Sequence, residues 1–273
     1  MSTSKAGRKA SAVARRTQAA FPGLLEEMTL DEVRAFNPEV AVLPLGSTEP
    51  HGPHLPYGTD TYQVTQMSRM GVEKANARGA RALLYPTLPI TNNVNMRKFP
   101  FACRIGVRTL MTVLADVAMQ CKEDGVSKMV LVNGHGGNPG AIAAALRECA
   151  CRDDMPFLCL AARLEPAGYQ SPLEAPGEHG DEYETSMMLS IRPDLVRMDR
   201  LANNPMSKIK VPGLHRADFV RPWHLYLPVS AGGETRKSTA AKGRTVLEAE
   251  SEGLAELLVG LSQAAFDERF PYH

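Results

Sequence analysis

The segment GSTEPHGPHLPYGTD, residues 46–60, contains side chains that could bind a metal ion. Glu49 and His51 stand two positions apart, and Asp60 follows nine positions after His51. Proline recurs at every third position, which keeps the segment extended or turned because proline lacks an N–H and disfavours helix in the preceding residue. Residues two apart in an extended chain point to the same side. Glu49 and His51 therefore face one way, and carboxylate and imidazole ligands suit Zn²⁺, Mn²⁺ or Fe²⁺.

This spacing differs from the helical HExxH zinc motif, in which two histidines lie four residues apart on one helix face. A turn at Gly58 and Thr59 could bring the Asp60 carboxylate back toward Glu49 and His51. A bidentate carboxylate can bridge two metal ions, and hydrolases use ions about 3.5–4 Å apart to hold an attacking water. The alternative interpretation of the segment is a polar loop held only by its own hydrogen bonds.

A second candidate lies in the stretch VLVNGHGGN, where His135 follows an apolar run. A dinucleotide-binding turn is excluded by the spacing, because G-x-G-x-x-G counted from Gly134 requires glycine where the chain has Pro139. Glycines beside a histidine instead allow a metal ion and a substrate to approach closely. A lone histidine is more often structural, but together with the first segment this one indicates a ligand.

The third candidate is GEHGDEYETS, residues 177–186, in which half of the positions are acidic or histidine. These residues are Glu178, His179, Asp181, Glu182 and Glu184. An exposed helix N-terminus would also be acidic, because the helix dipole favours negative charge there. The apolar run SMMLSI begins within this segment and continues beyond it, which indicates that this helix end points into the packed body of the protein.

The elements that must position these residues alternate along the chain. Strands are predicted at 39–46, 80–90, 128–138 (running into the glycine-rich turn) and 156–164, and helices at 29–36, 60–79, 108–125, 139–150, 181–192 and 244–266. Alternating helices and strands, with strands apolar on both faces, predict an α/β fold with a mostly parallel sheet. Ligands of such sheets bind beyond the carboxyl ends of the strands, where the first two candidate segments begin. The loop-rich stretch 203–235 is expected to be a surface excursion or a lid.

Composition limits the classes of function. The chain has 273 residues, 44% of them hydrophobic, which is enough for one large domain, expected at residues 23–273. Residues 1–22 are basic and are expected to form a flexible arm or an oligomer contact. A net charge of +1 gives no reason to expect a nucleic-acid or membrane partner. Five cysteines without a CxxC pair argue against a zinc knuckle and a disulfide framework, and favour a cytoplasmic location.

The motifs LPLGSTEPHGPHLPYGTD, NGHGGN and EHGDEYETS, in this order, resemble those of the creatininase (creatinine amidohydrolase) family. The resemblance covers about residues 38–262. It implies a three-layer α/β/α sandwich around a parallel sheet, assembly into homo-oligomers with a hexamer favoured, and hydrolysis of cyclic amides, formamides and related C–N bonds. It also implies one or two divalent metal ions per subunit, of zinc, manganese or iron.

The resemblance further implies roles for individual residues by motif position. The implied metal ligands are Glu49, His51, Asp60, His135 and Glu184. Asp60 would bridge the ions, while Glu178 and His179 match positions of proton transfer and substrate contact. The motifs alone leave open whether Glu182 or Glu184 is the fifth ligand. Backbone N–H groups of Gly136 and Gly137 are candidates for stabilising the oxyanion of the substrate.

The chain departs from the family pattern at three places. Gly137 stands where creatininase has a glutamate, and Asp181 replaces a glycine. In NNVNMRKFP, residues 92–100, Asn95 and Met96 replace the expected Glu and His. The missing His argues against creatinine itself and favours a more polar, hydroxylated or anionic substrate. Candidate substrate contacts are Asn93, Asn95 and Arg97.

The sequence therefore predicts a divalent-metal-dependent hydrolase that acts on a cyclic amide, formamide or similar C–N bond of a small polar molecule. Two alternatives remain at this point. One is hydrolytic ring opening of an oxidised cyclitol or sugar of the keto-inositol type. The other is a non-catalytic scaffold that binds metal for structure only, which would have a closed coordination sphere rather than an open position.

Overall fold

A four-stranded parallel sheet with the strand order β2-β1-β3-β4 forms the centre of the computed structural model, which describes residues 23–175 and 177–272. The strands are β1 (Val40–Leu45), β2 (Ala82–Leu84), β3 (Lys128–Asn133) and β4 (Phe157–Ala161). Every pairing in this sheet is parallel, which confirms the predicted sheet. The predicted basic arm, residues 1–22, lies outside the described residues.

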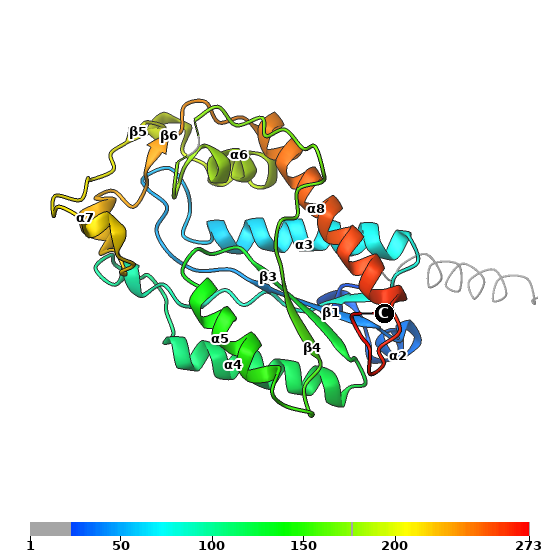
Figure 1. The fold of residues 1–273 in the computed structure, drawn as a ribbon. Helices are drawn as coiled ribbons and strands as arrows, with labels where there is room; N and C mark the ends of the chain where they lie inside the picture. Colours follow the sequence, from blue (N-terminus) through cyan, green and yellow to red (C-terminus); the bar gives the residue numbers. More distant parts are fainter. Residues whose placement is uncertain (1–22, 176, 273) are drawn as a thin grey trace, which may run out of the picture.

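Helices cover both faces of the sheet (Figure 1). The α-helices are α2 (Leu30–Phe36), α3 (Thr59–Ala77), α4 (Val107–Glu123), α5 (Pro139–Cys149), α6 (Glu182–Ile191), α7 (Trp223–Tyr226) and α8 (Ala240–Gln263). Figure 1 shows α3, α6 and α8 on one side and α4 and α5 on the other. This is the predicted three-layer arrangement. Among the described residues, none of the helices has both the length and the apolar character needed to cross a bilayer.

The alternation of side chains along β1 supplies both hydrophobic cores. Val40 and Val42 belong to the core beneath α3 and α8, whereas Ala41 and Leu43 belong to the core beneath α4 and α5. Successive residues of a strand point to opposite faces of the sheet, so a strand covered on both sides is apolar throughout. The unbroken apolar run of this strand therefore reflects its central position in the sheet.

Several element boundaries differ from the sequence-based expectation. The capping box of Thr29 and Glu32 opens α2 as predicted. Strand β2 ends at Leu84, well before residue 90, because Pro86 and Pro89 cannot donate to a ladder. The last long helix begins at Ala240, earlier than predicted, because the side chain of Thr239 caps it.

The order of the strands creates a crevice between β1 and β3. From β1 the chain passes to β2 on one side of it, and later enters β3 on the other side. Connections leaving the carboxyl ends of β1 and β3 therefore diverge, and ligands of open α/β sheets bind at such a switch point. The two-stranded ribbon of β5 (Asn203–Asn204) and β6 (Gly233–Glu234) and the helix α7 lie toward the same end of the molecule (Figure 1).

Candidate metal centre

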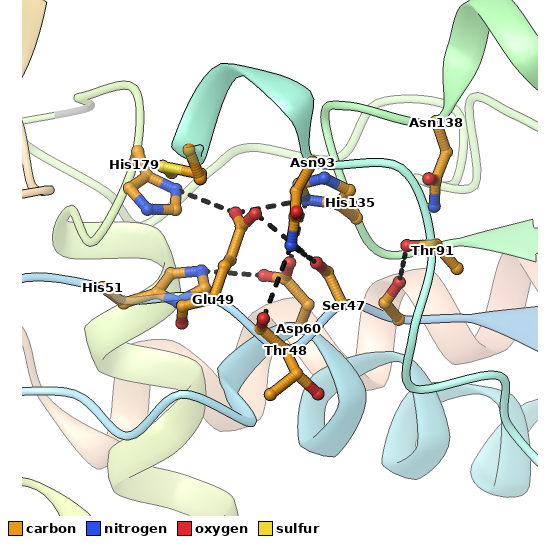
Figure 2. Close-up of polar contacts among 12 residues, drawn as sticks. Ser47, Thr48, Glu49, His51, Asp60, Thr91, Asn93, His135, Asn138 and His179 are labelled. Carbon is orange, nitrogen blue, oxygen red and sulfur yellow. Dashed lines mark hydrogen bonds and ion pairs between the residues drawn. The ribbon is translucent and has the colours of Figure 1, made fainter. Parts of the chain in front are cut away.

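The segment after β1 brings three predicted ligands to the sheet edge. Glu49, His51 and Asp60 are buried, with exposed fractions of 1%, 0% and 2%. The chain between them folds back on itself, since His51 forms an antiparallel bridge with Leu55. Asp60 is the second residue of α3, so the helix start fixes its carboxylate beside the imidazole of His51 (Figure 2).

The other two predicted ligands come from separate elements and meet the first three. His135 follows β3, and Glu184 lies in the first turn of α6. Among the described residues, three groups of three side chains have ligand atoms that all lie within 4.8 Å of one another. His179 forms one of them with Glu49 and His51, and the predicted ligands alone form the other two: Glu49, Asp60 and His135, and His51, Asp60 and Glu184. Asp60 belongs to both groups: its Oδ1 lies 2.8 Å from His51 Nε2 and its Oδ2 lies 3.0 Å from His135 Nδ1.

The two imidazoles are oriented as metal ligands usually are. His51 Nδ1 donates to the carbonyl of Glu49 at 3.0 Å, and His135 Nε2 donates to the carbonyl of Asn92 at 3.0 Å. A carbonyl oxygen only accepts, so these contacts fix which nitrogen carries a proton. Such backbone contacts typically hold the rings of metal-binding histidines. In each neutral ring the second nitrogen presents a lone pair toward carboxylate oxygens.

A lone pair that faces negatively charged oxygens is repelled by them. A proton or a cation between the imidazole nitrogen and the carboxylate oxygens removes this repulsion. Burial lowers the pKa values of His51 and His135, but the neighbouring carboxylates outweigh it and raise both to about 10. Burial raises the pKa of Asp60, yet the same two histidines bring it below its ordinary value. Burial, against the opposing charge of His51, raises the pKa of Glu184 to about 8. The cluster therefore favours positive charge between these nitrogens and oxygens, and its imidazole and carboxylate donors fit a divalent cation.

His179 lies against the same cluster. Its ring centroid is 4.1 Å from that of His51, and its Nδ1 is 3.9 Å from Glu49 Oε1. Its Nε2 donates to the carbonyl of Pro50 at 2.9 Å. Burial, followed by the charge of His51, lowers the pKa of His179 well below its ordinary value. The neutral ring therefore directs its Nδ1 lone pair toward the cluster, where it can accept a proton or bind an ion.

Glu178 occupies a different position from its neighbour. Its carboxylate pairs with Arg221 and accepts the hydroxyl of Tyr226. Burial raises its pKa, but Arg221 and Tyr226 outweigh this effect and bring it below the ordinary value. Within the described part of the chain, no hydrogen bond or ion pair joins Glu178 to the cluster. Trp223, from the same stretch as Arg221, packs edge-on against His179 with 4.8 Å between ring centroids.

The start of α6 shows which acid faces the cluster. Glu182 pairs with Lys242 at 2.5 Å and accepts the N–H of Glu174 at 2.9 Å. Asp181 caps the helix, accepting the N–H of Glu184 at 3.1 Å. Glu184 Oε2 instead lies 3.8 Å from His51 Nε2. Glu182 therefore anchors α6 to α8, and Glu184 is the acid that reaches the other predicted ligands.

Asn93, predicted to contact the substrate, holds the loop beneath Glu49. It is completely buried, and its Nδ2 donates to Ser47 Oγ at 3.1 Å and to the carbonyl of Cys103 at 3.0 Å. Ser47 Oγ in turn donates to Glu49 Oε2 at 3.4 Å (Figure 2). The Oδ1 atom of Asn93 has no hydrogen-bond partner among the described residues. Asn93 thus orients Glu49 through Ser47 and retains one free acceptor.

The remaining predicted substrate residues differ in their surroundings. Asn95 is half-buried and Arg97 is exposed, and neither contacts the cluster within the described residues. A Cβ atom at Gly136 would meet open space, whereas at Gly137 it would lie 2.2 Å from the carbonyl oxygen of Asn92. No side chain fits at position 137 without displacing that carbonyl. The glutamate expected there from the family pattern would therefore need a different loop.

Sequence reasoning missed several residues around the cluster. Ser47 lies within the first motif, but nothing in the pattern distinguished it from a loop serine. The stretch RPWHLY carries Arg221, Trp223 and Tyr226, and includes the single tryptophan of the chain. That tryptophan in a loop-rich stretch was the available signal. Contacts with Glu178 and His179 depend on how this stretch folds back, which spacing does not reveal.

Comparison with known proteins gives a consistent result. The family model Creatininase, described as creatinine amidohydrolase, matches residues 26–258. The mycofactocin precursor peptide peptidase of Mycobacterium ulcerans is 32% identical over 215 residues, covering 75% of this chain and 78% of that protein. The creatinine amidohydrolase of Pseudomonas putida is 26% identical over 85% of this chain and 90% of that protein. The 3-dehydro-scyllo-inosose hydrolase of Thermotoga maritima is 26% identical over 90% of this chain and 84% of that protein.

Solved structures share the fold. A Bacteroides fragilis protein, provisionally named a creatinine amidohydrolase, has a TM-score of 0.83 at 28% identity, covering 91% of this chain and all of that chain. A zinc form of a creatininase variant, 24% identical, has a TM-score of 0.69 over 88% of this chain and 98% of that chain. A manganese form of creatininase, also 24% identical, has a TM-score of 0.68 over 89% and 99%. Taken with the family match across most of the sequence, these likenesses show that the chain belongs to the creatininase family of metal-dependent hydrolases.

Proposed function

We propose that this enzyme hydrolyses the C–N bond of an amide, formamide or cyclic amide in a small polar substrate. The observation that carries the proposal is the position of Asp60, whose two oxygens face two different histidines, each in a separate group of proposed ligands. Two relatives support the bond type, since one is named a peptidase and another a creatinine amidohydrolase. The proposed ligands are Glu49, His51, Asp60, His135 and Glu184.

The proposed cofactor is a pair of divalent ions, with Asp60 as the bridging ligand. Zinc or manganese is favoured over iron, because the structurally similar creatininases include zinc and manganese forms. When bound, such ions polarise a carbonyl and lower the pKa of water toward 7. Asp60 is suited to hold them because it lies at the N-terminus of α3, where the helix dipole favours a negative charge.

His179 is the proposed proton carrier. Its Nε2–H is held by the carbonyl of Pro50, so only Nδ1 is free to take a proton released beside Glu49 and deliver it to the leaving nitrogen. Trp223 packs edge-on against this ring and helps to hold it in place. Glu178 is ionised while Arg221 holds it, so it would act as a base or bind the substrate rather than donate a proton.

The turn after β3 is the proposed site for the substrate oxyanion. Within the described residues, the backbone N–H groups of Gly136 and Gly137 have no hydrogen-bond acceptor. Two free donors beside His135 can stabilise the negative charge that develops on a carbonyl oxygen under attack. Removing one such donor in other enzymes lowers kcat by roughly 10²–10³.

Ligand replacement tests the proposal. Glu49→Gln and His135→Ala are expected to reduce bound metal, measured by elemental analysis, and to lower turnover by at least roughly 10³-fold, while the circular-dichroism spectrum is retained. Glu256→Gln is a matched control, because Glu256 is exposed on α8. Full activity in either ligand variant would refute the assignment.

A substrate panel separates the proposed reaction from its closest alternative. Formamides, cyclic amides and small peptides are expected to be hydrolysed with added Mn²⁺ or Zn²⁺, and creatinine poorly, because Asn95 and Met96 replace the family's Glu and His. The Thermotoga maritima relative favours ring opening of an oxidised cyclitol as the second candidate. Turnover of a keto-cyclitol but of no amide would establish the alternative.

The assembly and the location of the enzyme are also part of the proposal. The family resemblance favours a homo-oligomer and in particular a hexamer. A cytoplasmic location agrees with cysteines that form no disulfide among the described residues. Light scattering would distinguish a single 29.7 kDa chain from a hexamer of such chains.

A further inference from the structure

A cavity of about 250 Å³ borders the candidate metal centre beneath α8. Residues of α3, α6, α8 and the turn after β3 line it. Its lining includes two of the proposed ligands, His135 and Glu184, and Gly136, where a Cβ atom would meet open space. Glu250 of α8 and Tyr183 of α6 line the same cavity. This volume would hold a chain of several heavy atoms. The cavity is smaller than a typical pocket for a drug-sized ligand.

Glu250 is the unusual residue of this cavity because no cation pairs with it. Its carboxylate is half-buried and accepts a hydrogen bond of 2.8 Å from the hydroxyl of Tyr183. Within the described residues it has no ion pair. Two other acids of the same helix are each paired with a cation: Glu248 with Lys74 at 2.7 Å and Glu252 with Arg78 at 2.6 Å.

A half-buried carboxylate without a cation is unfavourable, and the one hydrogen bond from Tyr183 only partly offsets its lost hydration. Burial raises the pKa of Glu250 to about 7; the Tyr183 hydrogen bond opposes this rise, and the nearby charge of Glu165 adds to it. A cationic ligand in the cavity would offset the lost hydration of the carboxylate. An ammonium or guanidinium group suits this position because it forms a charge-assisted hydrogen bond.

Tyr183 and Glu184 are consecutive residues of α6 that border different parts of the cavity. Tyr183 contacts Glu250, and Glu184 joins the ligand group of His51 and Asp60. Because Glu250, Glu184 and His135 all line this cavity, a molecule in it can contact both Glu250 and the metal centre. The absence of a side chain at Gly136 leaves open space beside His135.

We propose that this cavity is a substrate subsite in which Glu250 binds the cationic group of an amine-bearing amide. The inference rests on the proposed function, since the amide carbonyl would lie at the metal centre while the cation pairs with Glu250. It defines the substrate class as amides with an ammonium or guanidinium group a few bonds from the scissile C–N bond. Glu250 would be a binding residue that sets specificity and takes no part in the proton transfers.

The first test measures binding without turnover. The probes are n-butylammonium and its neutral match n-butanol, titrated into the metal-loaded full chain and followed by ligand-observed NMR. We expect saturable binding of n-butylammonium to the wild type and to the control Glu256→Gln, weakened roughly 10-fold or more by Glu250→Gln. Binding of n-butanol should be the same in all three proteins. Equal binding of the cation to wild type and Glu250→Gln, or none to the wild type, would overturn the inference.

The second test uses turnover and separates the inference from the proposed function. N-formyl-1,4-diaminobutane and the neutral N-formylpentylamine form a matched pair of formamides. Glu250→Gln should raise KM roughly 10-fold for the cationic formamide only, with kcat and metal content unchanged. Hydrolysis of both formamides without this change in KM would contradict the role of Glu250. Hydrolysis of neither, with n-butylammonium binding intact, would contradict the proposed reaction and leave the cation site in place.

Discussion

At the scale of single residues, Asp60 is the carboxylate shared by the two groups that consist of predicted ligands alone. Its Oδ1 faces His51 and its Oδ2 faces His135, so both proposed ion positions depend on it. Glu184 belongs to only one of the two groups. Loss of Asp60 should therefore affect more bound ions than loss of Glu184.

Ion stoichiometry should reveal this difference. Asp60→Asn is expected to lose both ions, because each site loses a charged ligand, whereas Glu184→Gln should lose no more than one. Elemental analysis of purified variants measures the ratio of metal to protein, with Glu256→Gln as the control for handling. Retention of two ions by Asp60→Asn would be inconsistent with a bridging role.

Glu250 should make the stability of the fold depend on pH. Its pKa is about 7 in the folded protein against an ordinary value of 4.5, so between these values the unfolded chain releases a proton that the folded chain keeps. The free energy of unfolding therefore falls as pH rises through this window, and the loss is complete above pH 7. Glu250→Gln is expected to raise the free energy of unfolding by about 1–3 kcal/mol at pH 8 and to change it little at pH 4. Urea unfolding at the two pH values measures the difference, and an equal effect at both would contradict it.

Sequence reasoning predicted five ligands whose side chains the structure brings together, but it could not predict the hydrogen bonds around them. Glu49, His51 and Asp60 were recognisable because proline spacing, period-two geometry and residue type point to the same chemistry. Asn93 was predicted to contact the substrate, and its side-chain nitrogen donates hydrogen bonds to Ser47 and to a backbone carbonyl. Whether a polar side chain faces a ligand or the backbone depends on loop packing, which spacing does not encode.

At the scale of elements, the turn after β3 is shaped by how closely the loop containing Asn92 approaches it. The place of a Cβ atom at Gly137 is filled by the Asn92 carbonyl oxygen and by His135 Nε2, at 2.2 and 2.4 Å. The same carbonyl holds the His135 ring. Position 137 therefore connects the packing of two loops to the orientation of a proposed ligand.

Alanine substitutions at the adjacent positions 136 and 137 test whether this close approach matters for stability and metal binding. Gly137→Ala is expected to lower the free energy of unfolding by about 1–3 kcal/mol and to reduce metal binding, because the added methyl displaces Asn92 from His135. Gly136→Ala is the matched control: its Cβ meets open space, so stability should change by less than about 0.5 kcal/mol. Thermal unfolding and metal content measure both, and equal behaviour of the two variants would argue against the close approach.

At the scale of the whole molecule, the alternation of predicted strands and helices along the chain was enough to predict a parallel sheet covered by helices. It was not enough to predict the order of the strands in the sheet. The apolar runs of β1 and β3 indicated buried strands without showing that they are neighbours. Adjacency depends on which face each crossover covers, and that is decided by contacts such as those of α3 with α8. The crevice holding Asp60 and His135 became visible only with the strand order.

Removing the metal should loosen the segments at this crevice before the sheet. After chelation, amide exchange is expected to accelerate in residues 46–60, 133–138 and 178–184, because the ions that neutralise the buried carboxylates there are lost. Exchange in β1 and β3, buried in both cores, should change little. Hydrogen exchange with mass spectrometry measures this, with re-added Zn²⁺ or Mn²⁺ as the reversal control. Uniform acceleration across the sheet would instead indicate global unfolding.

The ligand groups take their members from the connection after β1, the turn after β3 and the start of α6, which lie far apart along the chain. An ion bound there ties these stretches together in the native state only, much as a reversible cross-link would. Each tenfold rise in free ion concentration above the dissociation constant then adds about 1.4 kcal/mol per ion to the resistance of the fold to unfolding. Supply of the ion would thus govern the lifetime of this enzyme as well as its activity.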